Sequence, residues 1–241
     1  MDKSTIKYPA AAFDLDGTLY PNASFYVRLL PFMLKEQKYL RAFGKARKRL
    51  RDESRKEKCR NAEEFYRLQA EYMADTLKQD PASLMERTEK IIYRGWEPLF
   101  KKVRLFPHVK ETLKALREKG VKLALLSDFP LENKIENLGI SGLWDVVLCS
   151  ETIGELKPDP LPFGELSRVM GFPPEDILYV GNSFSYDVIG AQKAGMNTAW
   201  IVSKRKYLHL NKSKNKQQAP AAPKADFVFY DYRQLYTFMI P

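Results

Sequence analysis

The sequence predicts an α/β fold: a doubly wound parallel sheet with an all-helical domain inserted after its first strand. From about residue 106 onwards, short apolar runs alternate with amphipathic helical segments, the pattern of a parallel sheet covered on both faces. Between residues 20 and 105, apolar residues instead recur at helical spacing and no strand-like alternation appears. The predicted domains are therefore a core of residues 1–19 and 106–241 and an α-helical domain of residues 20–105.

The predicted strands are short apolar runs, as expected for strands that are buried on both faces. They are Tyr8–Phe13, Val121–Leu126, Asp145–Cys149, Ile177–Val180, Thr198–Val202 and Asp226–Tyr230. Most of the helices between them end at a glycine, the residue favoured just beyond a helix C-terminus. They are Val109–Lys119, Leu131–Leu138, Pro162–Met170, Tyr186–Ala194 and Gln234–Met239.

The helical block, residues 20–105, is predicted to hold about four helices, one of them capped by Asn61. It carries most of the net charge of +10. A second basic stretch, Ser203–Ala225, is polar and is predicted to be a flexible surface loop. Positive charge gathered in this way suits anionic ligands in general, from small phosphates to nucleic acid.

Composition excludes several classes of protein. With 44% apolar residues the chain can form a core, so global disorder is excluded. The two cysteines and two histidines form no cluster with the spacing of a zinc site. No apolar run is long enough to span a membrane, and the first one, which Asp14 and Asp16 interrupt, does not resemble a signal peptide. We therefore expect a soluble, cytoplasmic protein without a membrane partner.

Two carboxylates, Asp14 and Asp16, directly follow the first predicted strand. Side chains two apart in an extended chain share a face, and ligands of open parallel sheets bind at the carboxyl ends of the strands. One carboxylate could attack phosphorus to form an aspartyl phosphate, while the other protonates the leaving alcohol and later activates water. Gly17 allows a tight turn, and the Thr18 hydroxyl can hold a phosphate oxygen. Taken alone, the segment could also be an acidic turn without catalytic function.

Later strand ends supply further polar residues. Ser127 could donate a hydrogen bond to a phosphate oxygen, and the Lys157 ammonium could neutralise both the attacking carboxylate and the phosphate. Asn182 and Asp187 could bind Mg²⁺ together with oxygen atoms of the first acidic turn. Each of these residues, taken singly, is more often a turn residue, a helix cap or a solvated side chain.

In this order, the four groups of residues resemble the four motifs of the haloacid dehalogenase-like hydrolase superfamily. The similarity covers residues 8–19 and about 105–240, and the segment Gly190–Met196 is also typical of that superfamily. The helical block resembles the C1-type α-helical cap of phosphoglycolate-phosphatase-like members. The resemblance implies a Rossmann-like core and an Mg²⁺-dependent phosphatase with an aspartyl-phosphate intermediate.

The resemblance also implies a role for each motif residue. The implied roles are nucleophile and metal ligand for Asp14, general acid/base and carbonyl metal ligand for Asp16, phosphoryl binding for Thr18 and Ser127, charge stabilisation for Lys157, and metal binding for Asn182 and Asp187.

One residue departs from the pattern. Phosphatase members usually carry an aspartate where this chain has Asn182, whose amide oxygen can bind Mg²⁺ but adds no negative charge. We therefore expect weaker metal binding. Dehalogenase members need no metal and do not keep an acid at this position. Asp16 argues against that branch, because displacing a halide requires no general acid.

The leading hypothesis is an Mg²⁺-dependent phosphomonoesterase that acts on a small phosphorylated metabolite or nucleotide under a closing helical cap. A second hypothesis, motivated by Asn182 and by the basic run Lys45–Arg51, is a non-catalytic descendant that binds phosphorylated ligands or nucleic acid, although such a run is more often a solvated helix face. A phosphomutase is the third hypothesis.

Three residues of the helical block follow soon after the acidic turn and could reach the site: Tyr20, Phe25 and Arg28. The aromatic residues among them could instead pack in the core of the helical block.

Overall fold

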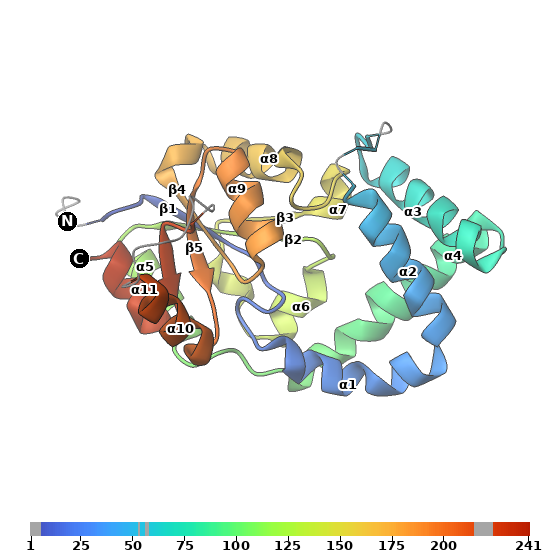
Figure 1. Ribbon diagram of the computed structural model, residues 1–241, viewed down its shortest axis with the longest axis horizontal. Helices are drawn as coiled ribbons and strands as arrows, with labels where there is room; N and C mark the ends of the chain where they lie inside the picture. The colour runs from blue at the N-terminus through green and yellow to red at the C-terminus, as the bar shows by residue number, and fades with distance from the viewer. Residues whose placement is uncertain (1–5, 53, 56–57, 215–223) are drawn as a thin grey trace.

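The core of the protein is a six-stranded, all-parallel sheet in the order β3-β2-β1-β4-β5-β6, which confirms the predicted α/β class (Figure 1). The computed structural model describes residues 6–52, 54–55, 58–214 and 224–241. The strands are β1 (Ala10–Phe13), β2 (Lys122–Ser127), β3 (Val146–Cys149), β4 (Ile177–Gly181), β5 (Asn197–Ile201) and β6 (Phe227–Phe229). All six lie within two residues of their predicted bounds.

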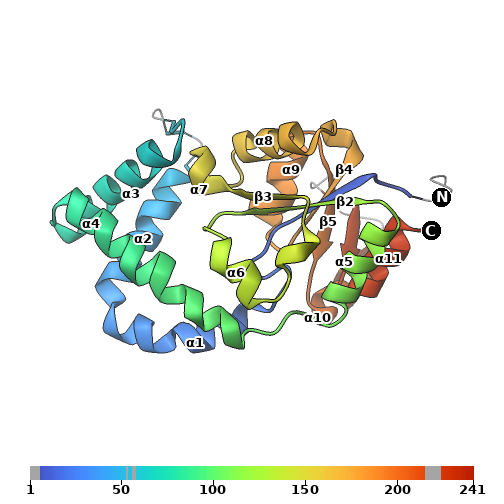
Figure 2. The ribbon, with the colours of Figure 1, turned by 180° about the vertical axis from the view of Figure 1, so that it is seen from behind.

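Helices cover both faces of the sheet. The helices of this part of the chain are α5 (Val109–Glu118), α6 (Glu132–Asn137), α7 (Ser150–Ile153), α8 (Pro160–Met170), α9 (Ile189–Lys193), α10 (Lys204–Lys214) and α11 (Tyr232–Met239). Figure 2 shows α5 and α11 side by side on one face, with α8 and α9 on the other. β1 follows the strand period of two: Ala11 and Phe13 pack with α5 and α11, whereas Ala10 and Ala12 pack with α8 and α9. The sheet is therefore doubly wound.

The helical segment, residues 22–102, lies to one side of the sheet (Figure 1). It contains α1 (Asn22–Lys35), α2 (Gln37–Leu50), α3 (Ala62–Leu77), α4 (Pro81–Thr88), a π-helical turn at Glu89–Arg94 and a 3₁₀ turn at Glu97–Lys102. Its apolar residues, among them Phe43, Met73 and Leu84, form a cluster that is largely separate from the sheet core. Asn61 caps α3 as predicted, because its side chain accepts the N–H of Glu64. The helical content is confirmed.

The predicted loop Ser203–Ala225 was wrong at its start, where α10 occupies Lys204–Lys214. Ser203 accepts the N–H of Lys206 at 3.3 Å, the bond of a helix N-cap, and lysine, arginine and leucine are good helix formers. Tyr207 then packs its ring against Tyr230, with centroids 4.9 Å apart. Residues 215–223 of the predicted loop lie outside the described residues. In the part of the chain that the structure describes, none of the helices has the length and apolar character needed to cross a bilayer.

Two helical glycines predict opposite effects of substitution by alanine. A Cβ at Gly190 in α9 would lie 2.6 Å from Cε2 of the buried Phe163, so Gly190→Ala should cost about 1–3 kcal/mol of unfolding free energy through overpacking. A Cβ at Gly164 in α8 meets nothing within 4 Å, so Gly164→Ala should add about 0.5–1 kcal/mol through helix propensity. Urea denaturation measures both. Equal stability of the two variants would contradict the packing argument.

Candidate functional site

The site is organised by the ammonium of Lys157, which lies at the carboxyl ends of β1 and β4. Its Nζ donates to Oδ1 of Asp14 at 2.7 Å, to Oδ1 of Asp187 at 2.8 Å and to the Tyr179 hydroxyl at 3.1 Å. All four side chains are buried. Burial alone would lower the pKa of Lys157, but Asp14 and Asp187 outweigh it and raise that pKa well above its ordinary value. Lys157 is therefore charged at every physiological pH.

Asp14 presents its second oxygen, Oδ2, to the Thr18 hydroxyl, which donates to it at 2.7 Å. The Asp14 N–H donates to the Val180 carbonyl, so the residue directly continues the pairing of β1 with β4. Burial raises the pKa of Asp14 to about 7, and Lys157 opposes that rise. The charge of this carboxylate therefore depends on the lysine beside it.

The turn after β1 brings Asn182 close to Asp14. Gly17 has φ +90°, and a Cβ there would lie 2.4 Å from Nδ2 of Asn182, so only glycine fits. The Thr18 hydroxyl lies 3.3 Å from Oδ1 of Asn182. The buried Tyr232 holds the turn in place, because its hydroxyl donates to the Thr18 carbonyl at 2.7 Å. The predicted proximity of the first and fourth motifs is thus present.

Asp16 lies at the cavity but does not contact Lys157. Its Oδ1 accepts the Tyr20 hydroxyl, and its Oδ2 lies 3.5 Å from Nζ of Lys134 on α6. Burial and the neighbouring Asp16 raise the pKa of Tyr20 well above its ordinary value, so the phenol keeps its proton and donates. Lys134 is buried between the rings of Phe100 and Phe129, with its Nζ 5.0 and 4.9 Å from their centroids. Lys134 was not predicted as a site residue, because in the sequence it resembles any other lysine of an amphipathic helix.

Of the three residues proposed to reach the site from the helical block, only Tyr20 does so. Phe25 stacks on Phe100 at 4.8 Å, and Arg28 bonds back to Ser24 one helical turn earlier. Ser127 ends β2 as predicted, but its hydroxyl oxygen accepts the Phe129 N–H at 3.1 Å and closes the turn. It is fully buried and is not among the residues that line the cavity. A role for Ser127 in binding phosphate stays a prediction.

A cavity of about 280 Å³ opens above these groups. Its walls come from the turns after β1, β2 and β4, from the loop before α8 and from the helical segment. The lining residues are Asp14, Asp16, Asn22, Tyr26, Arg51, Asp128, Phe129, Lys157, Asn182, Ser183, Tyr186 and Asp187. The helical segment thus contributes directly to the site, through α1 and the end of α2.

Arg51 and Asp128 are the most informative residues that sequence analysis missed as site residues. Arg51 donates from Nε to the Lys157 carbonyl at 3.1 Å and from a terminal nitrogen to Oδ2 of Asp128 at 2.8 Å. The other oxygen of Asp128 accepts the Lys157 N–H at 3.1 Å. The backbone of Lys157 is therefore held on both sides by a pair that joins the helical segment to the core.

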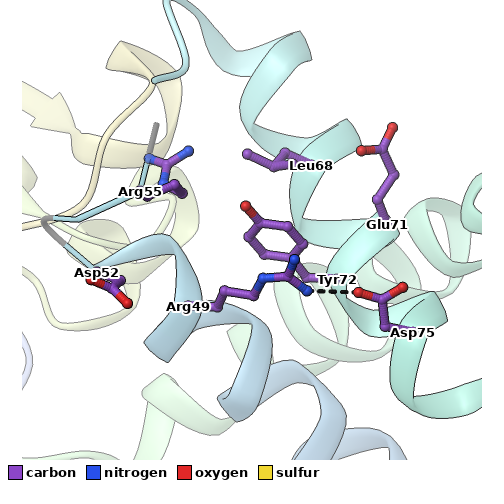
Figure 3. A pocket seen from close by; sticks show the side chains of 7 residues that line it. All are labelled: Arg49, Asp52, Arg55, Leu68, Glu71, Tyr72 and Asp75. Atoms are coloured by element: carbon purple, nitrogen blue, oxygen red, sulfur yellow. Dashed lines mark hydrogen bonds and ion pairs between the residues drawn. The ribbon is translucent and has the colours of Figure 1, made fainter. Parts of the chain in front are cut away.

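The remaining arginines of the basic run do not form one exposed phosphate-binding face. Arg47 is buried, pairs with Glu151 of α7 and donates to the Asp128 carbonyl at 2.9 Å. Arg49 pairs with Asp75 of α3 at 2.6 Å in the surface pocket of Figure 3. The hypothesis of nucleic-acid binding through Lys45–Arg51 therefore loses two of its arginines, Arg47 and Arg51, to contacts with the core.

The donor set matches the chemistry of Mg²⁺. Asp14, Asp187 and Asn182 offer only oxygen ligands to one cavity, and Mg²⁺ prefers oxygen. Each carboxylate oxygen of Asp14 and Asp187 already accepts a hydrogen bond, from Lys157, Thr18 or the Ser183 N–H, but has a second lone-pair direction. No group of three or more His, Cys, Asp or Glu residues in the described parts of the chain is arranged to hold an ion. The set fits Mg²⁺ in kind, with two carboxylates and one amide.

Comparison with known proteins agrees with this geometry. The sequence profile of the family described as haloacid dehalogenase-like hydrolase matches residues 8–195, which include every residue that lines the cavity. The chain belongs to the haloacid dehalogenase-like hydrolases. The resemblance of the four motifs to this superfamily is therefore confirmed.

Similar members of the family differ in activity. A phosphoglycolate phosphatase of Haemophilus influenzae is 32% identical over 155 residues, 63% of this chain and 65% of that protein. The match thus spans a little under two thirds of that relative. A glyceraldehyde 3-phosphate phosphatase of Methanopyrus kandleri is 31% identical over 209 residues, 80% of this chain and 83% of that protein. An L-2-haloacid dehalogenase structure from Xanthobacter autotrophicus superposes with a TM-score of 0.64 at 20% identity, covering 96% and 98% of the two chains, which shows the shared fold alone.

The contact of Arg51 with Asp128 predicts a pH-dependent stability. Burial opposes the charge of Asp128, but Arg51, Lys157 and Arg47 outweigh it and lower the pKa of Asp128 from 3.8 to about 2. Because the folded-state pKa is depressed, the carboxylate stabilises the fold above pH 4 to 5, and this contribution disappears as the pH falls toward about 2. Asp128→Asn should lose about 2 kcal/mol of unfolding free energy at pH 7, since the amide turns a donor toward Arg51.

Urea denaturation between pH 7 and pH 3 measures this difference, which should shrink as the pH falls. The control is Asp75→Asn, which breaks the exposed pair with Arg49 and should change stability by less than about 1 kcal/mol. A cost for Asp128→Asn that stays constant down to pH 3 would contradict the assignment.

Proposed function

We propose that the protein is an Mg²⁺-dependent phosphatase that hydrolyses a small phosphorylated metabolite or nucleotide through an aspartyl phosphate on Asp14. The observation that carries the proposal is the contact of 2.7 Å between Asp14 and the Lys157 ammonium at the floor of a cavity, with Asp16 on its wall. The phosphatase relatives support the choice within the family.

The chemistry follows from the charges. When a carboxylate attacks a phosphate ester, two anions approach and repel each other. The Lys157 ammonium, which is hydrogen-bonded to Asp14, reduces this repulsion. Oδ2 of Asp14 is oriented by the Thr18 hydroxyl, which leaves the carboxylate in one rotamer. Asp16 gives a proton to the leaving alcohol and takes one from the water that cleaves the aspartyl phosphate. Tyr20 and Lys134 hold Asp16 in position for both steps.

Bound Mg²⁺ would add positive charge beside the phosphoryl oxygens, held by Asp14, Asp187, Asn182 and the Asp16 carbonyl. We also propose that residues 20–105 act as a cap domain over the core of residues 1–19 and 106–241. Asn22, Tyr26 and Arg51 line the cavity, so this segment would exclude water and contact the leaving group. A phosphomutase would use the same pair of aspartates, and product analysis separates the two activities.

Removal of the nucleophile is the first test. Asp14→Asn should reduce the hydrolysis of p-nitrophenyl phosphate, or of any metabolite found active in a phosphate-release screen, by at least about 1,000-fold. Surface Asp75→Asn should leave the rate unchanged, and circular dichroism confirms that both variants fold. A rate that survives Asp14→Asn would overturn the mechanism, and a wild type inactive on every phosphate ester would overturn the function.

The second test concerns the metal. A carboxylate in place of the Asn182 amide adds a negative charge, worth ~1 kcal/mol at ~4 Å in water, so Asn182→Asp should lower the Mg²⁺ concentration for half-maximal activity about fivefold. Asn197→Asp adds the same charge at the amino end of β5, the edge of the sheet away from the cavity, and should change it much less. Activity that resists EDTA, or equal effects of both substitutions, would contradict metal binding at Asn182.

A further inference from the structure

A second cavity, of about 420 Å³, adjoins the site just described. It lies at the same edge of the sheet, and residues that end or follow β4 and β5 and residues at the start of α10 line it. Asn182 lines both cavities, and Gly17 of the catalytic turn lines the second. The other lining residues are Phe106, Trp200, Ile201, Val202, Ser203, Lys204, Lys206 and Tyr230.

The second cavity is positively charged. Lys204 and Lys206 line it, while no aspartate or glutamate does so among the residues that the structure describes. The wall toward the first cavity is the Asn182 amide, which carries no charge. The cavity therefore favours anions, and nothing in its described lining repels them.

Aromatic rings hold both ammonium groups at the cavity. Nζ of Lys206 lies 4.1 Å from the ring centroid of Trp200, and Nζ of Lys204 lies 5.8 Å from that of Tyr230, within the range of cation–π attraction. The Trp200 ring is itself fixed, because its Nε1 donates to the Asn182 carbonyl at 2.9 Å and Phe184 packs on it at 4.8 Å. The same backbone segment thus carries the metal-site amide and supports the lysine-bearing wall.

We propose that this cavity is a subsite for a second anionic group of the substrate, a phosphate or a carboxylate remote from the phosphoryl group that is transferred. The inference rests on the proposed phosphatase function and narrows it to small phosphomonoesters that carry such a second anion. The transferred phosphoryl group lies at Asp14, on one side of Asn182. The second anion lies on the other side, where Lys204 and Lys206 donate charge-assisted hydrogen bonds and Ser203 adds a hydroxyl.

The kinetic test compares alkyl phosphates of three to six carbons that end in a methyl group, a carboxylate or a second phosphate. Wild type should show a KM about tenfold lower for the doubly anionic esters than for the methyl ester, with similar kcat. The double variant Lys204→Ala/Lys206→Ala should lose this preference and keep kcat and KM for the methyl ester. The matched control is Arg205→Ala, which removes a charge from the same helical turn but does not line the cavity.

Two kinetic results would overturn the subsite. One is an active wild type without preference for doubly anionic esters. The other is an equal loss of preference in Arg205→Ala, which would indicate general attraction by the basic surface instead of binding at the two lysines. The carboxylate and phosphate arms of the series distinguish which anion the subsite takes.

A binding measurement separates failure of the subsite from failure of the proposed function. Methylenediphosphonate, which is not hydrolysed, is titrated while tryptophan fluorescence is followed, and Trp200→Phe identifies the part of the signal that comes from the cavity. The signal should saturate in wild type and Arg205→Ala and be lost in the double lysine variant. A chain that hydrolyses no phosphate ester but gives this result has the anion site without the activity, whereas an unchanged signal in the double variant overturns the site itself.

Discussion

The structure of the site depends on one buried ammonium that is shared by two buried carboxylates. Lys157 lies 2.7 Å from Asp14 and 2.8 Å from Asp187, and the three residues come from three distant parts of the chain. Breaking a buried ion pair by removing one partner typically costs about 3–5 kcal/mol, because it leaves an uncompensated charge. The ends of β1 and β4 and the loop before α8 must therefore meet at this point for the fold to be stable. The same constraint gives the proposed nucleophile its counter-charge.

The helical segment belongs to that constraint, because it fixes the backbone of the lysine. Arg51 and Asp128 hold the carbonyl and the N–H of Lys157, and Arg47 holds the Asp128 carbonyl and the buried Glu151. These contacts explain part of the charge segregation in the sequence. The basic helical segment faces buried acids of a core that is otherwise near neutrality. A displacement of α2 relative to the core would have to break these pairs, so the positions of the helical segment and of Lys157 are energetically linked.

Much of the fold could be predicted because apolar periodicity is a local property. A run such as Ala10–Phe13 is buried on both faces whatever its partners are, and its period does not depend on distant residues. The four motifs follow because parallel strands bring their carboxyl ends to one edge. The pairing of charged side chains across the fold, in contrast, is not a local property of the sequence. Lys134 and Arg51 resemble any helical cation in the sequence, and only the folded chain shows that one contacts Asp16 and the other Asp128.

The error at α10 has a related cause. Residues 203–225 have the polar, basic composition of a loop, but a helix needs only a cap, good helix formers and one packed side chain, which Ser203 and Tyr207 supply. Ser127 is a different case, because its role in binding phosphate, expected from its place at a strand end, stays a prediction. In the structure its oxygen accepts the Phe129 N–H of the turn that follows, a local bond that serine forms readily.

The two cavities that Asn182 lines suggest a physical reason for an uncharged side chain at this position. On one side, Asp14 and Asp187 share a single ammonium, so ionisation of both carboxylates leaves one negative charge uncompensated, and burial raises the pKa of Asp14 to about 7. An aspartate at position 182 would add a second, favouring a metal ion but raising the cost of any anion that approaches without one. On the other side of Asn182 lies the second cavity, which is lined by two lysines and by no acid among its described residues. An aspartate at position 182 would attract the two ammonium groups and so compete with an anion bound in that cavity. A neutral amide would weaken the proposed metal site and leaves the second cavity positive, and both consequences follow from one uncharged side chain between the two cavities.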